Sequence, residues 1–157
     1  MNPTISRSKI AASLLVVTAI SSGLLHAEVK PNPLFTDGAV LQRGQSVPVW
    51  GTANDGEKVS VEFGGQKLDT TAKDGKWRVD LQPLEAGGPF TMKISGENTV
   101  TVNNLLVGEV WICSGQSNMD YRFKGSASAA EEKPKAKYPN LRMYTVKKVT
   151  SPVPQAE

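Results

Sequence analysis

Residues 59–63 read Val59-Ser60-Val61-Glu62-Phe63, with an apolar side chain at every second position. This period of two is typical of a β-strand that has one buried face and one solvated face. Similar short segments recur from Val47 to Val102, at intervals of about ten residues. Turn-forming sequences such as Gly64-Gly65 and Asp74-Gly75 separate them. The pattern predicts an antiparallel β-sandwich or jelly-roll-like module.

The pattern changes after Asn104. Residues 105–113 (LLVGEVWIC) are almost continuously apolar, which is typical of a central parallel strand covered by helices. One more core strand of the sandwich would have the same pattern. Residues 126–133 predict a short helix that Pro134 ends, and residues 141–146 alternate like a second strand.

Two strands cannot form an α/β sheet of ordinary size. We therefore expect a multidomain chain of β plus α/β class. A β-sandwich-like module occupies residues 28–104, and the truncated start of an α/β domain occupies residues 105–157.

Residues 1–27 have the layout of a secretory signal peptide. Arg7 and Lys9 precede an apolar run over residues 10–20, and Ala27 provides a small residue at the expected cleavage site. The run is too short to span a membrane. We therefore expect export to a periplasm or out of the cell, without a membrane anchor after cleavage. An uncleaved or lipid-linked N-terminus is the alternative.

Composition excludes several classes of function. Cleavage after residue 27 removes two of 18 basic residues and none of 15 acidic ones, so the formal charge falls from +3 to +1. The sequence has no stripe of basic residues interleaved with aromatic ones, so nothing in it indicates a nucleic-acid partner. A single cysteine, Cys113, allows no intrachain disulfide. The single histidine, His26, lies in the predicted signal peptide, so we expect no His-ligated metal and no cofactor in the mature chain.

Ser117 lies just past the C-terminal end of the apolar stretch. Open α/β sheets bind their ligands at this end of their strands. In residues 113–119 (CSGQSNM), Gly115 permits a tight turn, which Asn118 can hold through its side chain. The backbone N–H of Ser117 is then a candidate oxyanion donor. Met119 stands where the nucleophile elbow of α/β-hydrolases has its second glycine. From these residues alone, a catalytic serine and a structural turn are both open.

Longer stretches resemble one family. Residues 108–119 (GEVWICSGQSNM) are similar to the signature of the sialate O-acetylesterases, which are carbohydrate esterases of the SGNH type. Residues 34–43 (LFTDGAVLQR) and 47–53 (VPVWGTA) resemble the N-terminal β module of that family. Residues 138–144 (YPNLRMY) resemble the segment that follows its variable insertion. The resemblance covers essentially the whole mature chain.

The resemblance implies a flavodoxin-like SGNH hydrolase domain in which Ser117 is the nucleophile, with Gly115, Gln116 and Asn118 as supporting motif residues. It implies an acetylated sugar or glycan as substrate and acetate as product. A histidine would take the serine proton, and backbone amides would stabilise the oxyanion. The Asp and His partners of the family have no counterpart here, so we expect this chain to be close to inactive by itself.

A non-catalytic β-sandwich that binds glycans or links domains is the competing interpretation. Trp77, beside Lys76 and Arg78, is the better surface candidate for stacking on a sugar, although core packing is the commoner use of such a residue. We expect Trp111 in the core, and Cys113 as a small buried hydrophobe.

Overall fold

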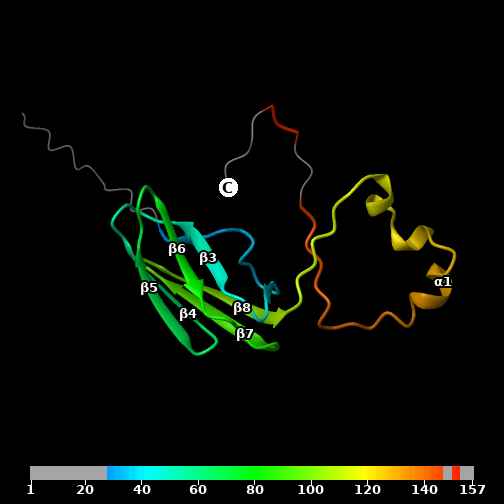
Figure 1. Cartoon of the computed structure of the whole chain (residues 1–157), viewed down its shortest axis with the longest axis horizontal. Coiled ribbons are helices and arrows are strands. Elements are labelled where there is room, and N and C mark those ends of the chain that lie inside the picture. The colour runs from blue at the N-terminus through cyan, green and yellow to red at the C-terminus, as the bar shows by residue number, and fades with distance from the viewer. Residues whose placement is uncertain (1–27, 147–149, 153–157) are drawn as a thin grey trace, which may run out of the picture.

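The structure is a computed structural model that describes residues 28–146 and 150–152. The predicted signal peptide, residues 1–27, lies outside the described residues. Within them, the chain folds mainly as strands that form two sheets (Figure 1). The strands are β1 (Lys30–Pro31), β2 (Val40–Gln42), β3 (Val47–Thr52), β4 (Lys58–Phe63), β5 (Gln66–Thr71), β6 (Lys76–Leu81), β7 (Gly87–Ser95) and β8 (Thr99–Gly108).

The two sheets have the orders β1-β3-β6 and β2-β8-β7-β4-β5. Adjacent strands are antiparallel, as predicted, except that β2 pairs with β8 in parallel. A short hairpin forces its two strands to be antiparallel, whereas β2 and β8 are joined only through the other strands of the module. Their relative direction is therefore free, and the antiparallel prediction is wrong for this pair.

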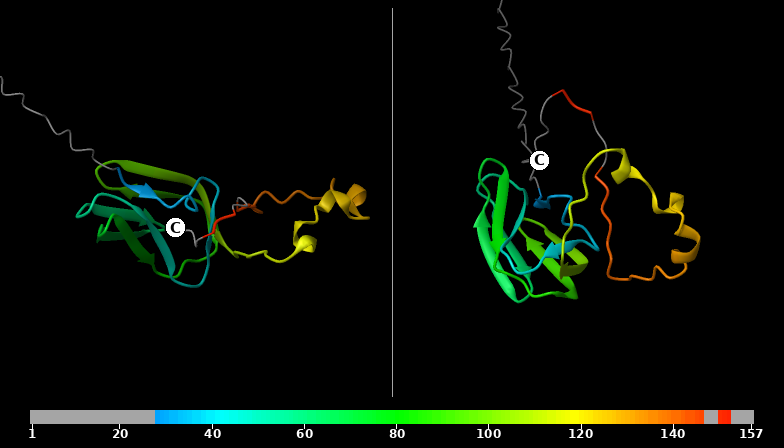
Figure 2. Two further views of the ribbon diagram at one scale, coloured as in Figure 1. Left: turned by 90° about the horizontal axis from the view of Figure 1, so that it is seen from above. Right: turned by 45° about the vertical axis from the view of Figure 1, so that its right-hand side comes forward.

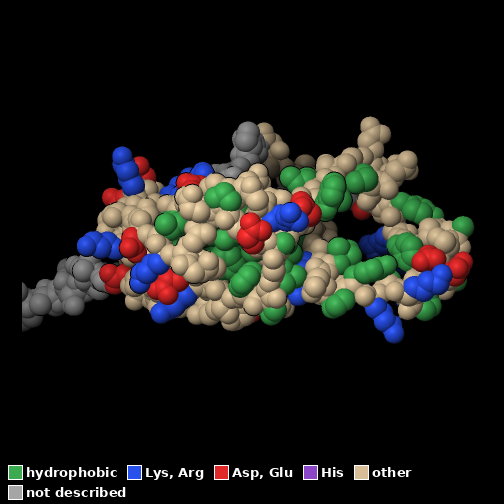
Figure 3. Space-filling model, turned by 60° about the horizontal axis from the view of Figure 1, so that its bottom comes forward, with side chains coloured by type: hydrophobic (Ala, Val, Ile, Leu, Met, Phe, Trp, Pro, Cys, Tyr) green, Lys and Arg blue, Asp and Glu red, His purple; other side chains and the backbone are tan. Residues whose placement is uncertain are grey.

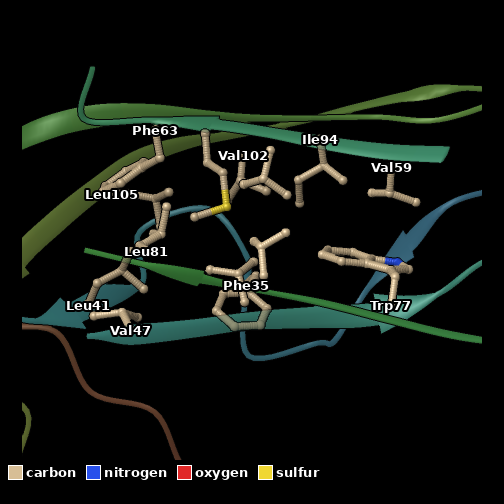
Figure 4. Packing of buried hydrophobic residues seen from close by; sticks show 14 of the residues in the cluster. Phe35, Leu41, Val47, Val59, Phe63, Trp77, Leu81, Ile94, Val102 and Leu105 are labelled. Carbon is tan, nitrogen blue, oxygen red and sulfur yellow. The ribbon is translucent and has the colours of Figure 1, made fainter. Parts of the chain in front are cut away.

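The apolar side chains of both sheets meet in one core. Val59, Val61 and Phe63 of β4 are buried, while Ser60 and Glu62 between them are partly exposed, which confirms the predicted alternation. Figure 4 shows Val59 of the five-stranded sheet directed toward Trp77 of the other sheet. Each fully buried side chain of this size contributes about 1.5–3 kcal/mol.

Trp77 is 2% exposed, so it packs in the core, which is the commoner use of such a residue, and it is no surface site for a sugar. Successive side chains of a strand point to opposite faces, and Trp77 therefore faces the core while Lys76 and Arg78 face solvent. Its indole N–H donates to the carbonyl of Thr52 at 3.1 Å, which satisfies the one polar atom that burial of the ring brings into the core.

The hairpin between β4 and β5 forms as the sequence predicts. Phe63 pairs with Gln66, so Gly64 and Gly65 alone make the turn. Both have positive φ, +56° and +79°, as a two-residue turn of this kind requires. Gly87 begins β7, which carries register shifts between Gly87 and Phe90 and between Phe90 and Met92.

The strand predicted over residues 105–113 ends early. Leu105–Val107 belong to β8 and are buried, so the core-strand interpretation holds for them. Residues 109–113 and 141–146 have no regular secondary structure, because within the described residues no neighbouring strand pairs with their backbone. The division of the chain into domains stays a prediction.

Helices are short and lie outside the sheets. Two 3₁₀ turns, η1 (Ser117–Asp120) and η2 (Phe123–Gly125), precede α1 (Ala129–Glu132). The predicted helix thus shrinks to a single turn, and it ends before Pro134 as expected. Across the described part of the chain, no helix combines the length and apolarity that crossing a membrane requires.

A buried carboxylate joins two turns of the module. Glu57 is 8% exposed. One carboxylate oxygen accepts the backbone N–H of Asn54 at 2.9 Å, and the other accepts the backbone N–H of Glu97 at 2.8 Å. These bonds link the turn before β4 to the turn between β7 and β8.

We predict that Glu57→Gln lowers the free energy of unfolding by about 1–3 kcal/mol, because the amide keeps one oxygen and turns its NH₂ toward a backbone N–H. Urea unfolding of residues 28–157 measures the change. Glu85→Gln, at an exposed glutamate, is the matched control and leaves the midpoint unchanged. Equal midpoints for both variants would contradict the role of Glu57.

Gly51 lets β1 approach β3. A Cβ atom at Gly51 would lie 2.0 Å from the carbonyl oxygen of Lys30, and backbone atoms cannot yield as a flexible side chain can. We therefore predict that Gly51→Ala lowers the free energy of unfolding by about 1–3 kcal/mol. Gly108→Ala is the control, because its nearest neighbour lies at 3.7 Å. Thermal unfolding that ranks Gly108→Ala as the more damaging change would refute this account.

Candidate functional site

The predicted site residues lie on a long excursion from the five-stranded sheet. We call residues 109–142 the serine segment. It leaves the sheet where β8 ends at Gly108, extends away from both sheets, and comes back toward them near Arg142 (Figures 1 and 2). Its regular structure consists of η1, η2 and α1.

Ser117 begins the 3₁₀ turn η1. The backbone N–H of Met119 donates to the carbonyl of Gln116 at 2.9 Å, and Tyr121 donates to the carbonyl of Asn118 at 3.3 Å. Gly115 has a φ of +156°, and a Cβ there would lie 2.7 Å from the Cγ of Met119. The predicted tight turn is therefore present, and it needs glycine at this position.

The turn leaves the polar groups of Ser117 available. Among the described residues, neither its hydroxyl nor its backbone N–H has a hydrogen-bond partner. The side chain of Asn118 makes no hydrogen bond there either, so main-chain bonds alone hold the turn. A free N–H at the start of a 3₁₀ turn is a donor of the kind that stabilises an oxyanion.

All four predicted site residues are exposed: Gly115, Gln116, Ser117 and Asn118. Trp111, which the sequence predicts in the core, is 83% exposed, and Ile112 is 93% exposed. Cys113 is also exposed, so its predicted burial is wrong. Trp111, Ile112 and Cys113 were expected to lie within a sheet. In the described part of the chain, however, no second layer covers residues 109–113.

Exposed apolar side chains are concentrated in this part of the chain. Of the large hydrophobic residues that are exposed in the described part of the chain, all but Leu34 lie between Val110 and Val146. Figure 3 shows such side chains along the serine segment, whereas charged side chains are frequent over the sheets. A concentration of exposed apolar side chains of this kind indicates contact with another surface.

Ion pairs join the short helix α1, in the middle of the serine segment, to the lysine that follows it. Lys135 donates to the carboxylates of Glu131 at 2.9 Å and Glu132 at 3.0 Å. These bonds raise the pKa of Lys135 above its ordinary value, with Glu131 contributing most. All three side chains are exposed, so the ion pairs are screened by water and contribute little to stability. No cluster of three or more His, Cys, Asp or Glu residues suited to a metal occurs within residues 28–146 and 150–152.

The sequence is similar to curated carbohydrate esterases. It is 33% identical to the sialate O-acetylesterase of Mus musculus over 126 residues, which covers 71% of this chain and 23% of that protein. It is 34% identical to the sialate O-acetylesterase of Rattus norvegicus over 121 residues, covering 68% of this chain and 22% of that protein. The chain thus spans about a quarter of the length of these relatives. No protein-family model matches the sequence.

A solved structure gives the same result. The fold matches the crystal structure of a carbohydrate acetylesterase from Xanthomonas citri with a TM-score of 0.68 and 33% sequence identity. This match covers 70% of this chain and 26% of the solved one.

The exposure of Cys113 can be tested directly. We predict that a thiol reagent such as 5,5′-dithiobis(2-nitrobenzoate) modifies Cys113 in native residues 28–157 at about the rate of a free thiol, because its side chain is exposed. Absorbance of the released thiolate follows the reaction. Modification that requires prior denaturation would show that residues 109–113 are buried in this chain.

Proposed function

We propose that this chain, whose resemblance to the sialate O-acetylesterase family is confirmed, is the nucleophile-bearing part of an exported carbohydrate O-acetylesterase. The matched relatives are about four times as long as the part they share with this chain. The activity proposed here is therefore that of the whole protein. Its substrate is an acetylated sugar or glycan, and acetate is released.

The observation that carries the proposal is the setting of Ser117. It lies in the family-like sequence of residues 108–119, at the exposed start of a 3₁₀ turn, with its hydroxyl and N–H unpaired among the described residues. Its Oγ attacks the acetyl carbonyl carbon and loses its proton to a base. The sugar oxygen then leaves with a proton from the protonated base, and water hydrolyses the acetyl-serine to free acetate.

The oxyanion that forms during this attack needs hydrogen-bond donors. We assign the backbone N–H of Ser117 as one of them, because the turn leaves it without an internal acceptor. Gly115 supports the site by allowing the turn that aims this N–H. Gln116 and Asn118 support it through the carbonyls that accept the bonds from Met119 and Tyr121.

The base must come from outside the mature chain. The sequence contains one histidine, His26, which lies in the predicted signal peptide. We therefore place the catalytic histidine and its carboxylate partner in a part of the protein beyond these 157 residues. The length of the relatives supports this placement.

The exposed apolar side chains of the serine segment support the same conclusion. Trp111 and Ile112 are almost fully exposed, although burial of side chains of this size contributes about 1.5–3 kcal/mol each. The remainder of an SGNH hydrolase domain, packed over residues 109–146, would recover this energy. It would also exclude water around Ser117, which strengthens the electrostatic stabilisation of the oxyanion.

The competing interpretation, a non-catalytic module that binds glycans or links domains, gains no support from the tryptophans of the β module. Trp77, its better candidate for stacking on a sugar, is buried in the core. Trp50 is partly buried, with its ring in edge contact with Phe35 at a centroid distance of 5.0 Å. Neither ring presents an open face for a sugar.

We predict that Ser117→Ala in the full-length protein lowers acetate release from an acetylated sugar by about a thousandfold or more, because the nucleophilic oxygen is lost. An enzymatic acetate assay measures this, and a fluorophosphonate probe should label the wild type and not the variant. Ser114→Ala is the matched control, since Ser114 is also exposed and lies three residues earlier. Wild-type acetate release from Ser117→Ala would remove Ser117 from the mechanism.

We also predict that residues 28–157 alone hydrolyse 4-nitrophenyl acetate no faster than their Ser117→Ala variant, because they contain no histidine to activate the hydroxyl. Release of 4-nitrophenolate gives the rate. Turnover by the short chain that Ser117→Ala abolishes would show that the chain has a base of its own.

A further inference from the structure

The serine segment leaves the five-stranded sheet beside β2. Gln42, the last residue of β2, is the register partner of Gly108, the last residue of β8. The backbone N–H of Arg43 adds one more bond to the ladder, 2.9 Å from the carbonyl of Gly108. Beyond this point β8 has no strand partner in the described part of the chain, and the side chain of Gln42 continues the pairing.

The amide of Gln42 bonds to both residues that follow β8. Its Oε1 accepts the backbone N–H of Val110 at 2.9 Å, and its Nε2 donates to the carboxylate of Glu109 at 3.1 Å. Nε2 also donates to the carbonyl of Arg43 at 3.2 Å. A flipped amide would set its NH₂ against an N–H and its oxygen against a carboxylate, so only one orientation satisfies all three partners.

Glu109 is held from a second direction. The Nε of Arg43 lies 3.7 Å from its carboxylate. This pair is exposed and contributes little energy by itself. Together with the bond from Gln42, however, it fixes the side chain of Glu109 on the edge that β2 forms.

The serine segment returns to the same edge of the module. The Nη2 of Arg142 donates to Oδ1 of Asn104 at 3.3 Å, and its Nε is buried beside Gly38. The backbone N–H of Gly38 donates to the carbonyl of Asn103 at 3.0 Å, which ties this part of the chain to β8. Residues 37–43 therefore lie beside the serine segment both where it leaves the sheet and where it returns.

We propose that Gln42 is a positioning residue for the reaction of Ser117, acting through Glu109 and Val110. The proposal rests on the proposed esterase function. By fixing residues 109–110, Gln42 sets the direction in which the chain leaves the sheet, seven residues before Ser117. A slip of one residue here would move the following chain by about 3.3 Å, and displacements of about 1 Å at a reacting atom can cost a hundredfold in rate.

A charge exchange between Gln42 and Glu109 tests the proposal in the full-length protein. Gln42→Glu keeps an oxygen for the N–H of Val110 but places two carboxylates in contact, so we expect kcat for acetate release from 4-nitrophenyl acetate to fall at least about tenfold. The double variant Gln42→Glu with Glu109→Gln restores a donor and an acceptor at this contact. We expect it to recover most of the lost kcat.

Gln66→Glu is the matched control. The side chain of Gln66 also makes two hydrogen bonds, donating to the carbonyl of Gln82 at 3.2 Å and accepting its N–H at 2.8 Å, but it contacts no residue of the serine segment in these bonds. The same chemical change is therefore made at a glutamine of the β module with comparable bonding. We expect it to leave kcat unchanged.

Titration with a fluorophosphonate separates positioning from folding. If Gln42 positions Ser117, the Gln42→Glu protein has the wild-type number of reactive serines, each labelled more slowly, with a similar KM and melting temperature. Fewer reactive serines that are labelled at the wild-type rate would show a purely structural role and overturn the proposal.

Two other results would also overturn it: an unchanged kcat in Gln42→Glu, or a double variant no faster than Gln42→Glu alone. A wild-type protein that neither releases acetate nor reacts with the probe at Ser117 would instead refute the proposed function, and the positioning role with it. An active wild type with an insensitive Gln42 refutes only the positioning role, so the two failures are distinct.

Discussion

Between the two sheets, side chains such as Val59, Ile94 and Trp77 exclude water from one shared core, and the other features of the module depend on this contact. Each sheet has one apolar face, which is stable only when the other sheet covers it. The contact dictates which residues of every strand face inward. It also brings together turns that are distant in sequence, such as those that the carboxylate of Glu57 joins.

Strand β8 carries this constraint to the candidate site. Leu105 and Val107 are buried in the core, so the strand cannot slide or turn over without exposing them. Its parallel neighbour β2 then sets the place where the chain leaves the sheet, and Gln42 extends the pairing to Val110. A stable β module thereby provides a defined starting point for a segment that has little packing of its own.

The serine segment combines a well-formed local turn with neighbouring apolar side chains that are exposed to solvent. The turn at Ser117 needs only main-chain hydrogen bonds and the freedom of Gly115. Its neighbours Trp111 and Ile112 need a partner surface, and they are exposed. The turn at Ser117 can therefore form within this chain by itself. The proposed reaction also requires groups from the rest of a longer protein.

The sequence by itself determined the strands with clear alternation, such as residues 59–63, the Gly64-Gly65 hairpin, the serine turn and the family resemblance, because these depend on local periodicity, turn chemistry or a contiguous motif. Only the tertiary structure decided that β2 runs parallel to β8, that Trp77 lies in the core, and that Gln42 contacts Val110 across 68 positions of the chain. The alternation of apolar side chains predicts that a strand has an apolar face, but it does not predict which strand lies beside it. The apolar pattern of residues 109–113 shows the same limit, since a strand forms only where a neighbour accepts its hydrogen bonds.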